Sequence, residues 1–521
     1  MKPRATFLAC LIFTLILTVV DWGPLLKADW SIRDDYRFVS MMGPAGRISF
    51  SKFVEQCNPP QDWHLGSLVN RPTYYAVHSF WMFALGNHVA AWQLAKVAVF
   101  FIGLLCFALV MADFLGLVGG LSFTLFYALQ PMWCDIVPRA NCELFTATGI
   151  SVFTLGYLRL KSTGQGFSRL STVFLVAVTL LAGVAVAGSK ENFTVLMALL
   201  GVLLVCDLRH DTKSTQTRLL FVLIPVLVWS AIVGCYIYRG IRLAGGSNLY
   251  GSALVTSLPG LLKIFGQFLA PHEVTGFLLG LGLLASALLL VRSLTTSPSG
   301  HPDVRHEARI AVFNGFLLFS GFFLYYFYSG TIRVDRYAYP YRFLPLLSLT
   351  AFIGYARSCL RPWHPRLLPW LGAGTVVLFV TLTVLNDPTK NRERAVNYAA
   401  QTRLFGAQLD TISAALRTMP GRPVLFDSYA VYDQEAVASV EIYLRARGIT
   451  NPIYLKISGY SEATAATDFE KHMVRLIEGQ IGPGRRFVDF RELPANSAPL
   501  VVSFSRPQDD PLAAANVQML Y

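Results

Sequence analysis

The chain has 521 residues, of which 54% are apolar and only 14% are charged, and its mean hydropathy is +0.48. These values exclude an ordinary water-soluble domain of this length. The net charge of +13 would favour nucleic-acid binding in a soluble chain, but here much of it lies in loops between apolar segments, where Lys and Arg set orientation against anionic lipid. We therefore predict a polytopic α-helical protein of the lipid bilayer that binds no nucleic acid.

The first apolar segment covers residues 5–20 and follows Lys2 and Arg4. It resembles a signal peptide, but no convincing small-residue cleavage site precedes Asp21, so we predict an uncleaved first helix with a cytoplasmic N-terminus. A polar and aromatic outer loop follows over residues 22–90. Within it, the aromatic stretch 74–85 is too short to span and is predicted to lie in the membrane interface.

Further apolar segments predict the remaining membrane spans, which bring the total to about eleven and place the C-terminus opposite the N-terminus. The connectors predicted to be cytoplasmic are basic, whereas carboxylates gather on the other side, which indicates the working face. The predicted spans are 92–112, 115–131, 142–158, 170–187, 193–206, 218–238, 275–291, 310–328, 341–356 and 366–386. Residues 1–386 are thus predicted to form a transmembrane domain.

After residue 386 the charge rises and the apolar runs shorten to strand length. The alternation predicts a small extracytoplasmic α/β domain over residues 387–521, without a glycine-rich phosphate loop or a metal-ligand cluster. Its expected role is structural or acceptor docking. The predicted helices are 389–419, 432–447 and 462–478, and the predicted strands are 423–426, 452–457, 486–490 and 500–504.

An acidic motif, residues 29–39, directly follows the first span and contains Asp34 and Asp35 between Arg33 and Arg37. Adjacent carboxylates repel, so surroundings that desolvate one of them can hold it as a base near neutral pH while a cation fixes the other. The alternative is a solvated interfacial helix in which both carboxylates form salt bridges with the arginines.

Two further groups of charges lie at the ends of spans. Lys190 and Glu191 separate two spans with almost no loop, which indicates either a structural clasp or a site. Near the outer start of a late span, arginines alternate with tyrosines and Asp335, a pattern that suits a phosphate beside an apolar chain; the alternative is an aromatic belt with snorkelling arginines. These residues are Arg333, Arg336, Tyr337, Tyr339, Tyr341 and Arg342. His272 adds a polar group in the loop of residues 240–274.

Three cysteines, Cys57, Cys134 and Cys142, would face the oxidising side, where Cys134 and Cys142 are the nearest pair and Cys57 is the competitor for one disulfide. No Cys or His spacing indicates a metal site.

Four motifs follow one another along the chain: the aspartate pair, Arg71-Pro72, Ser189-Lys190-Glu191 and Asp335-Arg336-Tyr337-Ala338-Tyr339. This series resembles the GT-C superfamily of membrane glycosyltransferases, and within it the protein O-mannosyltransferases, over residues 1–386. The chain departs from the tetratricopeptide-linked branch by its small α/β tail, which leaves the acceptor open.

The resemblance implies transfer of one sugar from a polyprenyl-phosphate carrier to a hydroxyl on the outer side. Asp34, with Asp35 as the alternative, would be the base, and inversion would follow from a single displacement. Cations would stabilise the departing phosphate, namely Arg336, Lys190, Arg342 and Arg333. Supporting roles fall to Glu191, Arg71, Asp335, Tyr337, Tyr339 and His272. Relatives that modify asparagine use a divalent metal; we expect no metal here.

Two other functions stay open. An O-antigen polymerase or ligase would depend on arginines and a large outer loop, with less need for the aspartate pair. A lipid-glycan flippase would be indicated by inverted repeats in the sequence, and none is apparent. The acceptor is expected to be a protein or an envelope glycan or lipid, and the membrane a bacterial inner membrane.

Overall fold

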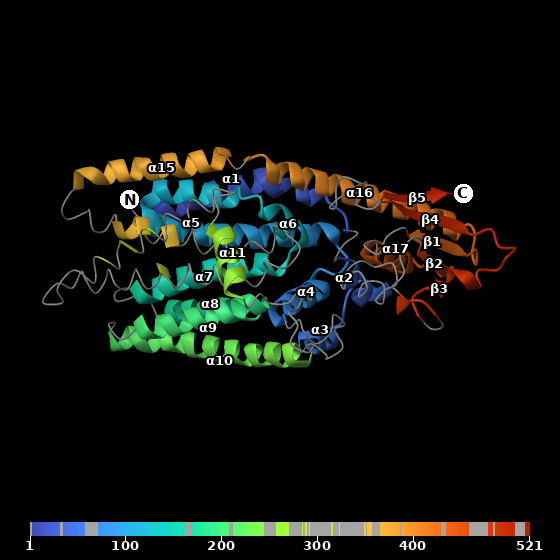
Figure 1. Cartoon of the computed structure of the whole chain (residues 1–521), viewed down its shortest axis with the longest axis horizontal. Helices are drawn as coiled ribbons and strands as arrows, with labels where there is room; N and C mark the ends of the chain where they lie inside the picture. Colours follow the sequence, from blue (N-terminus) through green and yellow to red (C-terminus); the bar gives the residue numbers. More distant parts are fainter. Residues whose placement is uncertain are drawn as a thin grey trace. The chain divides into compact units, whose positions relative to one another are not determined.

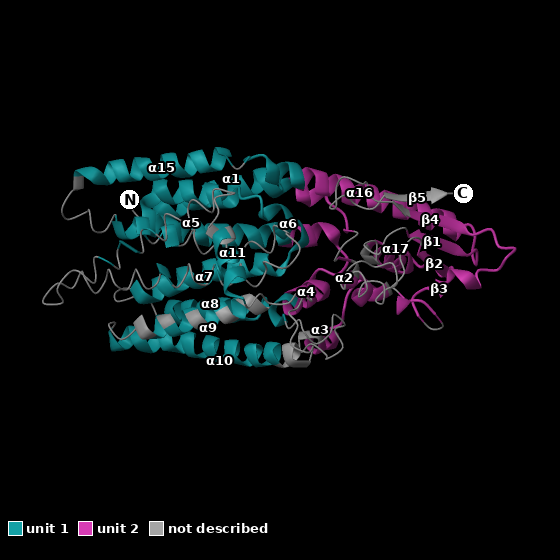
Figure 2. Cartoon of the chain, viewed as in Figure 1, with its two compact units in different colours: residues 1–23, 61–74, 96–394 teal, residues 24–60, 75–95, 395–521 magenta. Residues whose placement is uncertain are grey.

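The computed structural model describes residues 3–31, 35–57, 71–162, 169–207, 212–243, 257–269, 365–385, 387–428, 434–457, 478–482, 485–505 and 516–520, and short pieces between 284 and 356. The chain divides into two compact units, coloured separately in Figure 2. Unit 1 comprises residues 1–23, 61–74 and 96–394, and unit 2 comprises residues 24–60, 75–95 and 395–521. The predicted boundary between residues 386 and 387 stays a prediction.

Unit 1 is built from long apolar helices (Figure 1). They are α1 (Pro3–Trp22), most of α5 (Val89–Ala128), α6 (Trp133–Arg139), α7 (Cys142–Ser162), α8 (Arg169–Ala187), α9 (Glu191–Asp207), α10 (Lys213–Leu243), α11 (Leu258–Leu269) and α15 (Leu368–Leu385). Helices α7 to α10 pack against one another in chain order, and α8 also contacts α10.

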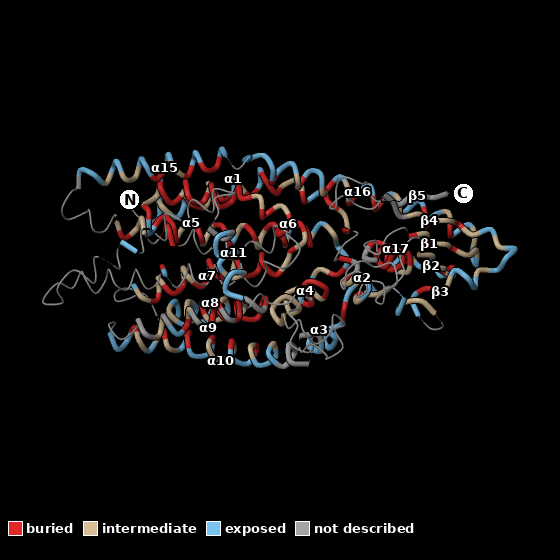
Figure 3. Tube along the Cα trace, in the orientation of Figure 1, coloured by how far each residue is buried: buried red, intermediate tan, exposed pale blue. Residues whose placement is uncertain are grey.

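Many large apolar residues of these helices are exposed rather than buried, and exposed residues are drawn pale blue along the trace in Figure 3. Leu170 is 81% exposed and Trp370 is 76% exposed, whereas Phe123 and Phe379 are fully buried. Outward apolar side chains along several helices are typical of a surface that contacts lipid. The chain is thus a polytopic α-helical membrane protein, as the composition predicts.

Five helical segments of the described residues are long and apolar enough to cross a membrane, namely Arg4–Lys27, Val89–Ala128, Leu170–Ala187, Lys213–Tyr238 and Leu368–Arg417. Helices α7 and α9 also form where spans were predicted. The predicted spans at 275–291 and 310–328, and most of 341–356, lie outside the described residues, so the count of about eleven stays a prediction.

Helix α5 contains a break where two separate spans were predicted. Gly116 has a φ of 76° and a ψ of 167°, which are not helical, and helix continues on both sides. Gly tolerates a positive φ because it lacks a Cβ. The chain reverses direction there, because the ring centroids of Phe107 and Tyr127 lie 4.2 Å apart although twenty residues of straight helix would separate them by about 30 Å. The two spans predicted at 92–112 and 115–131 are therefore two helices that pack against each other and meet at Gly116.

Unit 2 combines a five-stranded sheet with helices from distant parts of the chain. The helices are η1 (Gly23–Lys27, from Pro24 on), α2 (Asp35–Met42), η2 (Gly43–Ala45), α3 (Phe50–Cys57), α4 (Pro72–Ala84, from Tyr75 on), the first turns of α5, α16 (Lys390–Arg417, from Ala395 on), α17 (Gln434–Ala446) and η7 (Phe490–Glu492). The strands are β1 (Val424–Ser428), β2 (Ile453–Ile457), β3 (Val488–Asp489), β4 (Leu500–Ser505) and β5 (Asn516–Leu520).

The strand order is β3-β2-β1-β4-β5, parallel except for the antiparallel pair β4 and β5. On β1 the burial alternates, because Val424 and Phe426 are fully buried and Leu425 is half-buried. The predicted C-terminal α/β domain is confirmed, including four strands and the helices at 389–419 and 432–447. Strand β5 was not predicted, and the predicted helix at 462–478 lies almost entirely outside the described residues.

Candidate active site

Lys190 lies in the tight turn between α8 and α9 and is almost completely buried, with 1% of its surface exposed. Its Nζ forms an ion pair with the carboxylate of Glu143. Glu143 is the second residue of α7 and is 2% exposed. Burial of a charge costs several kcal/mol unless a partner of opposite sign compensates it. Glu143 therefore makes the buried position of Lys190 tenable.

Hydroxyl groups fix the turn beside this ion pair. The side chains of Thr146 on α7 and Ser189 in the turn are hydrogen-bonded to each other, and Ser189 also donates to the carbonyl of Val186 at 2.8 Å. Both hydroxyls are buried. The ion pair and the hydroxyl pair thus both connect α7 to this turn, through the adjacent residues Lys190 and Ser189.

The Arg71-Pro72 motif meets this turn from a distant part of the sequence. The Thr73 N–H donates to the carbonyl of Gly188 at 3.0 Å, and Arg71 Nη1 lies 3.7 Å from Cys142 Sγ, next to Glu143. A Cβ on Gly188 would lie 2.7 Å from Thr73 Oγ1, so only glycine permits this approach.

We call this group the lysine cluster; it consists of Arg71, Cys142, Glu143, Thr146, Ser189 and Lys190. Two of the motifs predicted to act together, Arg71 and Lys190, lie in the same cluster. Their two cations and a single carboxylate make a group that suits a phosphate. Glu143 was not predicted as the partner of Lys190, because no spacing connects residues 143 and 190.

Asp35, from the acidic motif, is the first residue of α2 in unit 2 and is 3% exposed. Its Oδ2 accepts a hydrogen bond from the N–H of Ser31 at 2.9 Å. A helix N-terminus favours a carboxylate electrostatically, and a hydrogen bond to the charged form favours ionisation. Asp35 is thus buried and held by a backbone hydrogen bond, unlike a carboxylate on a solvated interfacial helix.

An aromatic group seats α2 within unit 2. Phe38 stacks on His78 of α4 with ring centroids 4.3 Å apart and also contacts Trp92 of α5, whose centroid is 5.5 Å away. Trp81 and Trp30 complete the group by edge contacts with Trp92. This apolar packing fixes the helix that carries Asp35.

The other predicted site residues are not brought together by the described part of the chain. Asp34 lies outside the described residues, as do His272, Arg333, Asp335, Arg336, Tyr337, Tyr339 and Arg342. Glu191 begins α9, but its side chain is not described. Asp35 belongs to unit 2, and the lysine cluster belongs to unit 1. These assignments stay predictions.

Of the disulfides that the sequence left open, the one between Cys134 and Cys142 is not formed, because both residues are thiols. The Cys134 Sγ instead lies 3.0 Å from Asn391 Oδ1, and Cys142 lies beside Arg71. Cys57 has no described side chain. Among the side chains that are described, no three His, Cys, Asp or Glu residues are grouped to hold a metal ion.

No protein-family model and no curated protein matches the chain. Solved structures give weak similarities. ArnT from Cupriavidus metallidurans bound to undecaprenyl phosphate matches with 13% identity and a TM-score of 0.42, over 95% of this chain and 92% of that chain.

The oligosaccharyltransferase of Archaeoglobus fulgidus, tethered to an acceptor peptide with an NVT sequon, matches with 12% identity and a TM-score of 0.43. That match covers 84% of this chain and 63% of the oligosaccharyltransferase. Similarities of this size do not bear on the reaction.

Proposed function

We propose that the chain is an inverting membrane glycosyltransferase of the GT-C type, which moves one sugar from a polyprenyl-phosphate donor to a hydroxyl of an extracytoplasmic acceptor. The observation that carries this proposal is Asp35, a carboxylate buried at the start of a helix and held by a backbone N–H. A fixed, desolvated carboxylate is the group that a reaction with a weakly acidic hydroxyl requires.

In the proposed reaction a carboxylate of the acidic motif takes the proton of the acceptor hydroxyl. The hydroxyl oxygen forms its bond to the anomeric carbon while the bond between that carbon and the phosphate oxygen breaks. A single displacement inverts the anomeric configuration, and polyprenyl phosphate leaves with the electron pair. Asp34 is favoured as the base by its position in the motif, and Asp35 by its described geometry.

The leaving phosphate needs positive charge, and no general acid, because it departs as an anion. In the lysine cluster, Glu143 balances one of the two cations, so Lys190 and Arg71 together leave one net positive charge, and both are candidates to bind the phosphate. Arg336 and Arg342 are the further candidates, with Arg333 beside them. We propose no metal requirement, and the acceptor is a protein or an envelope glycan or lipid.

Sugar transfer by the purified protein tests this function. The assay uses a panel of radiolabelled polyprenyl-phosphate sugars and crude envelope acceptor, with the wild type, Asp34→Asn and Asp35→Asn. Loss of the base lowers the rate by about 10²–10⁴-fold while donor binding survives. Glu55→Gln is the matched control, since Glu55 is an exposed carboxylate of the same unit, and it is expected to retain the wild-type rate.

Consumption of a donor by the wild type, abolished by one of the two aspartate substitutions, supports an inverting transferase and identifies its base. Product with the opposite anomeric configuration to the donor supports single displacement. If no donor is consumed, or if both variants keep the wild-type rate, the proposal is wrong, and a polymerase or flippase takes its place.

A further inference from the structure

Tyr443 of α17 contacts the acidic motif although 412 residues separate the two in the sequence. The tyrosine is 1% exposed, and its hydroxyl donates to the carbonyl of Ser31 at 2.8 Å. Burial raises the pKa of this hydroxyl well above its usual value, and the carboxylates of Asp35 and Asp29 raise it further. The hydroxyl therefore keeps its proton and acts as a donor at any physiological pH.

Ser31 has both of its backbone polar groups engaged. Its carbonyl accepts from Tyr443, and its N–H donates to Asp35 Oδ2 at 2.9 Å. A displacement of the Ser31 backbone would therefore move the donor of the Asp35 hydrogen bond. Ser31 thus connects the tyrosine to the Asp35 carboxylate, and the tyrosine itself does not touch the reacting atoms.

The same segment is held at Asp29 by a second C-terminal helix. The Asp29 N–H donates to Thr402 Oγ1 of α16 at 3.0 Å, and the Gln93 amide donates to the Asp29 carbonyl at 3.4 Å. Gly406 of α16 leaves room for the Asp29 carboxylate, since a Cβ there would lie 2.5 Å from Asp29 Oδ2. Residues 29–31 are thus held at both ends by elements of unit 2.

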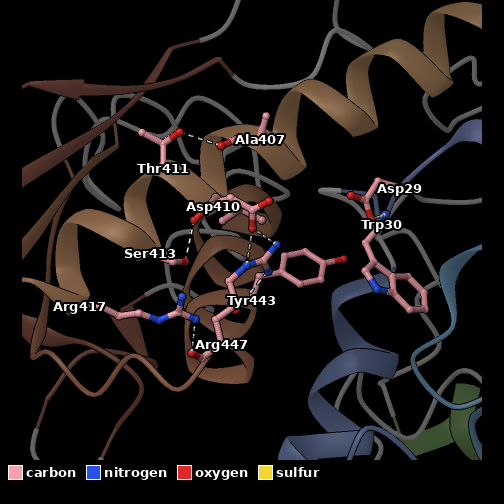
Figure 4. A network of polar contacts seen from close by, with 10 residues as sticks. Asp29, Trp30, Ala407, Asp410, Thr411, Ser413, Arg417, Tyr443 and Arg447 are labelled. Atoms are coloured by element: carbon pink, nitrogen blue, oxygen red, sulfur yellow. Dashed lines mark hydrogen bonds and ion pairs between the residues drawn. The ribbon is translucent and has the colours of Figure 1, made fainter.

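The tyrosine itself is rigidly placed. Its ring packs edge-on against Phe405 of α16 with centroids 5.7 Å apart, and α17 packs against α2. Arg447, in the turn directly after α17, pairs with Asp410 of α16 at 3.1 Å (Figure 4). The two helices therefore present the hydroxyl from a fixed position, which is what a positioning group needs.

We propose that Tyr443 is a positioning residue for the acidic motif: its hydroxyl fixes Ser31, whose N–H orients the Asp35 carboxylate. This inference rests on the proposed function, because it assumes that the motif supplies the base. It assigns a catalytic purpose to the C-terminal α/β domain, which the sequence predicted only as structural or docking.

Titration near Asp35 involves several other groups. They are Asp29 on the same segment, Arg37 on α2, His78 on α4 against Phe38, Tyr398 on α16, Tyr443 on α17 and Arg447 directly after α17. None of these groups changes in Tyr443→Phe except the hydroxyl itself. A shift of the acidic limb of the pH–rate profile in that variant therefore reports the contact between the tyrosine and Ser31.

The test compares the wild type, Tyr443→Phe and the control Ser413→Ala in the full-length protein. Ser413 is buried in α16, but its hydroxyl donates within its own helix, to Leu409, at 2.6 Å. We expect Tyr443→Phe to lower kcat about 2- to 12-fold, the loss of one hydrogen bond, with an unchanged KM for the donor. Because a weakened hydrogen bond favours the protonated carboxyl, the acidic limb of its pH–rate profile moves to higher pH.

Hydrogen–deuterium exchange gives a readout that needs no activity. The peptide that contains the Ser31 amide is expected to exchange faster in Tyr443→Phe and unchanged in Ser413→Ala. If Tyr443→Phe is not recovered folded, Thr402→Val loosens the same segment from α16 and takes its place with the same readouts.

Exchange and pH profile that superimpose on the wild type would overturn the inference, as would an equal change in Ser413→Ala. Failure of the proposed function looks different. If Asp34→Asn and Asp35→Asn both keep full transfer, the motif holds no base, whereas an inactive aspartate variant beside an unshifted Tyr443→Phe profile refutes only the positioning role.

Discussion

The lysine cluster and the acidic motif bury their charged groups in different ways. In unit 1, Lys190 from the α8–α9 turn and Glu143 from α7 neutralise each other directly, with one hydroxyl pair beside them. In unit 2, Asp35 receives a hydrogen bond from a neutral backbone N–H, and the chain of contacts continues through Ser31 to a tyrosine of the C-terminal domain. The first arrangement pairs two charges, and the second holds one charge through uncharged groups.

Because of this difference, we expect the two groups to affect different measurements when they are changed. A buried ion pair that loses one member leaves an uncompensated charge, so its loss is expressed mainly in the free energy of unfolding. A carboxylate held by uncharged donors can change protonation while its donors stay in place, so its loss is expressed mainly in the rate and its pH dependence. Three substitutions test how far this contrast extends.

The largest effect is expected at the ion pair. Glu143→Gln leaves the ammonium of Lys190 buried without its carboxylate and lowers the free energy of unfolding by about 3–5 kcal/mol. Unfolding in detergent measures this value. The control is the double variant Lys190→Met with Glu143→Gln, which removes both charges and is expected to regain most of the stability. A single variant as stable as the wild type would show that the pair is not a structural clasp.

A smaller effect is expected where the Arg71-Pro72 motif approaches the α8–α9 turn. In Gly188→Ala the new methyl group would meet Thr73 Oγ1 at 2.7 Å and Pro72 Cγ at 3.1 Å. Such overpacking costs about 1–3 kcal/mol of unfolding free energy. Gly234→Ala on α10 is the matched control, since nothing lies within 4 Å of its new Cβ. Equal stabilities for the two variants would mean that the approach of Thr73 is not fixed.

The smallest effect is expected at the segment before Asp35. Thr402→Val removes the acceptor for the Asp29 N–H and lowers the unfolding free energy by about 0.5–1.5 kcal/mol. The exposed Thr411 of the same helix, whose hydroxyl donates to Ala407 at 2.9 Å, provides the control Thr411→Val, which is expected to change stability little. If Thr402→Val lowered the unfolding free energy by more than about 3 kcal/mol, the contrast would fail, because this segment would then stabilise the fold as much as the ion pair does.

Local patterns predicted most of the helices and strands. The apolar lengths at 170–187 and 366–386 gave α8 and α15 within two residues at each end, and the switch to short apolar runs located β1, β2 and β4. Strand β5 was missed because its residues, Asn516–Leu520, show no run of β-branched or aromatic side chains. The break at Gly116 was expected only as a gap between spans.

The sequence also indicated the chemical types at the site: a buried lysine between two spans and an acidic motif after the first. It did not reveal their partners. Glu143 lies 47 residues from Lys190, and Tyr443 lies 412 residues from Ser31. A carboxylate or a tyrosine at such distances carries no local signal, because hydrophobic periodicity and capping depend on neighbours within a few turns.

The sequence by itself determined that this chain is an apolar helical protein with a small α/β end, since length and hydropathy decide how much chain must leave water. Only the tertiary structure decided which carboxylate neutralises Lys190 and which helices hold the acidic motif. Each of those contacts satisfies a buried polar group, and the partner that reaches it is chosen by packing in three dimensions rather than by position in the chain.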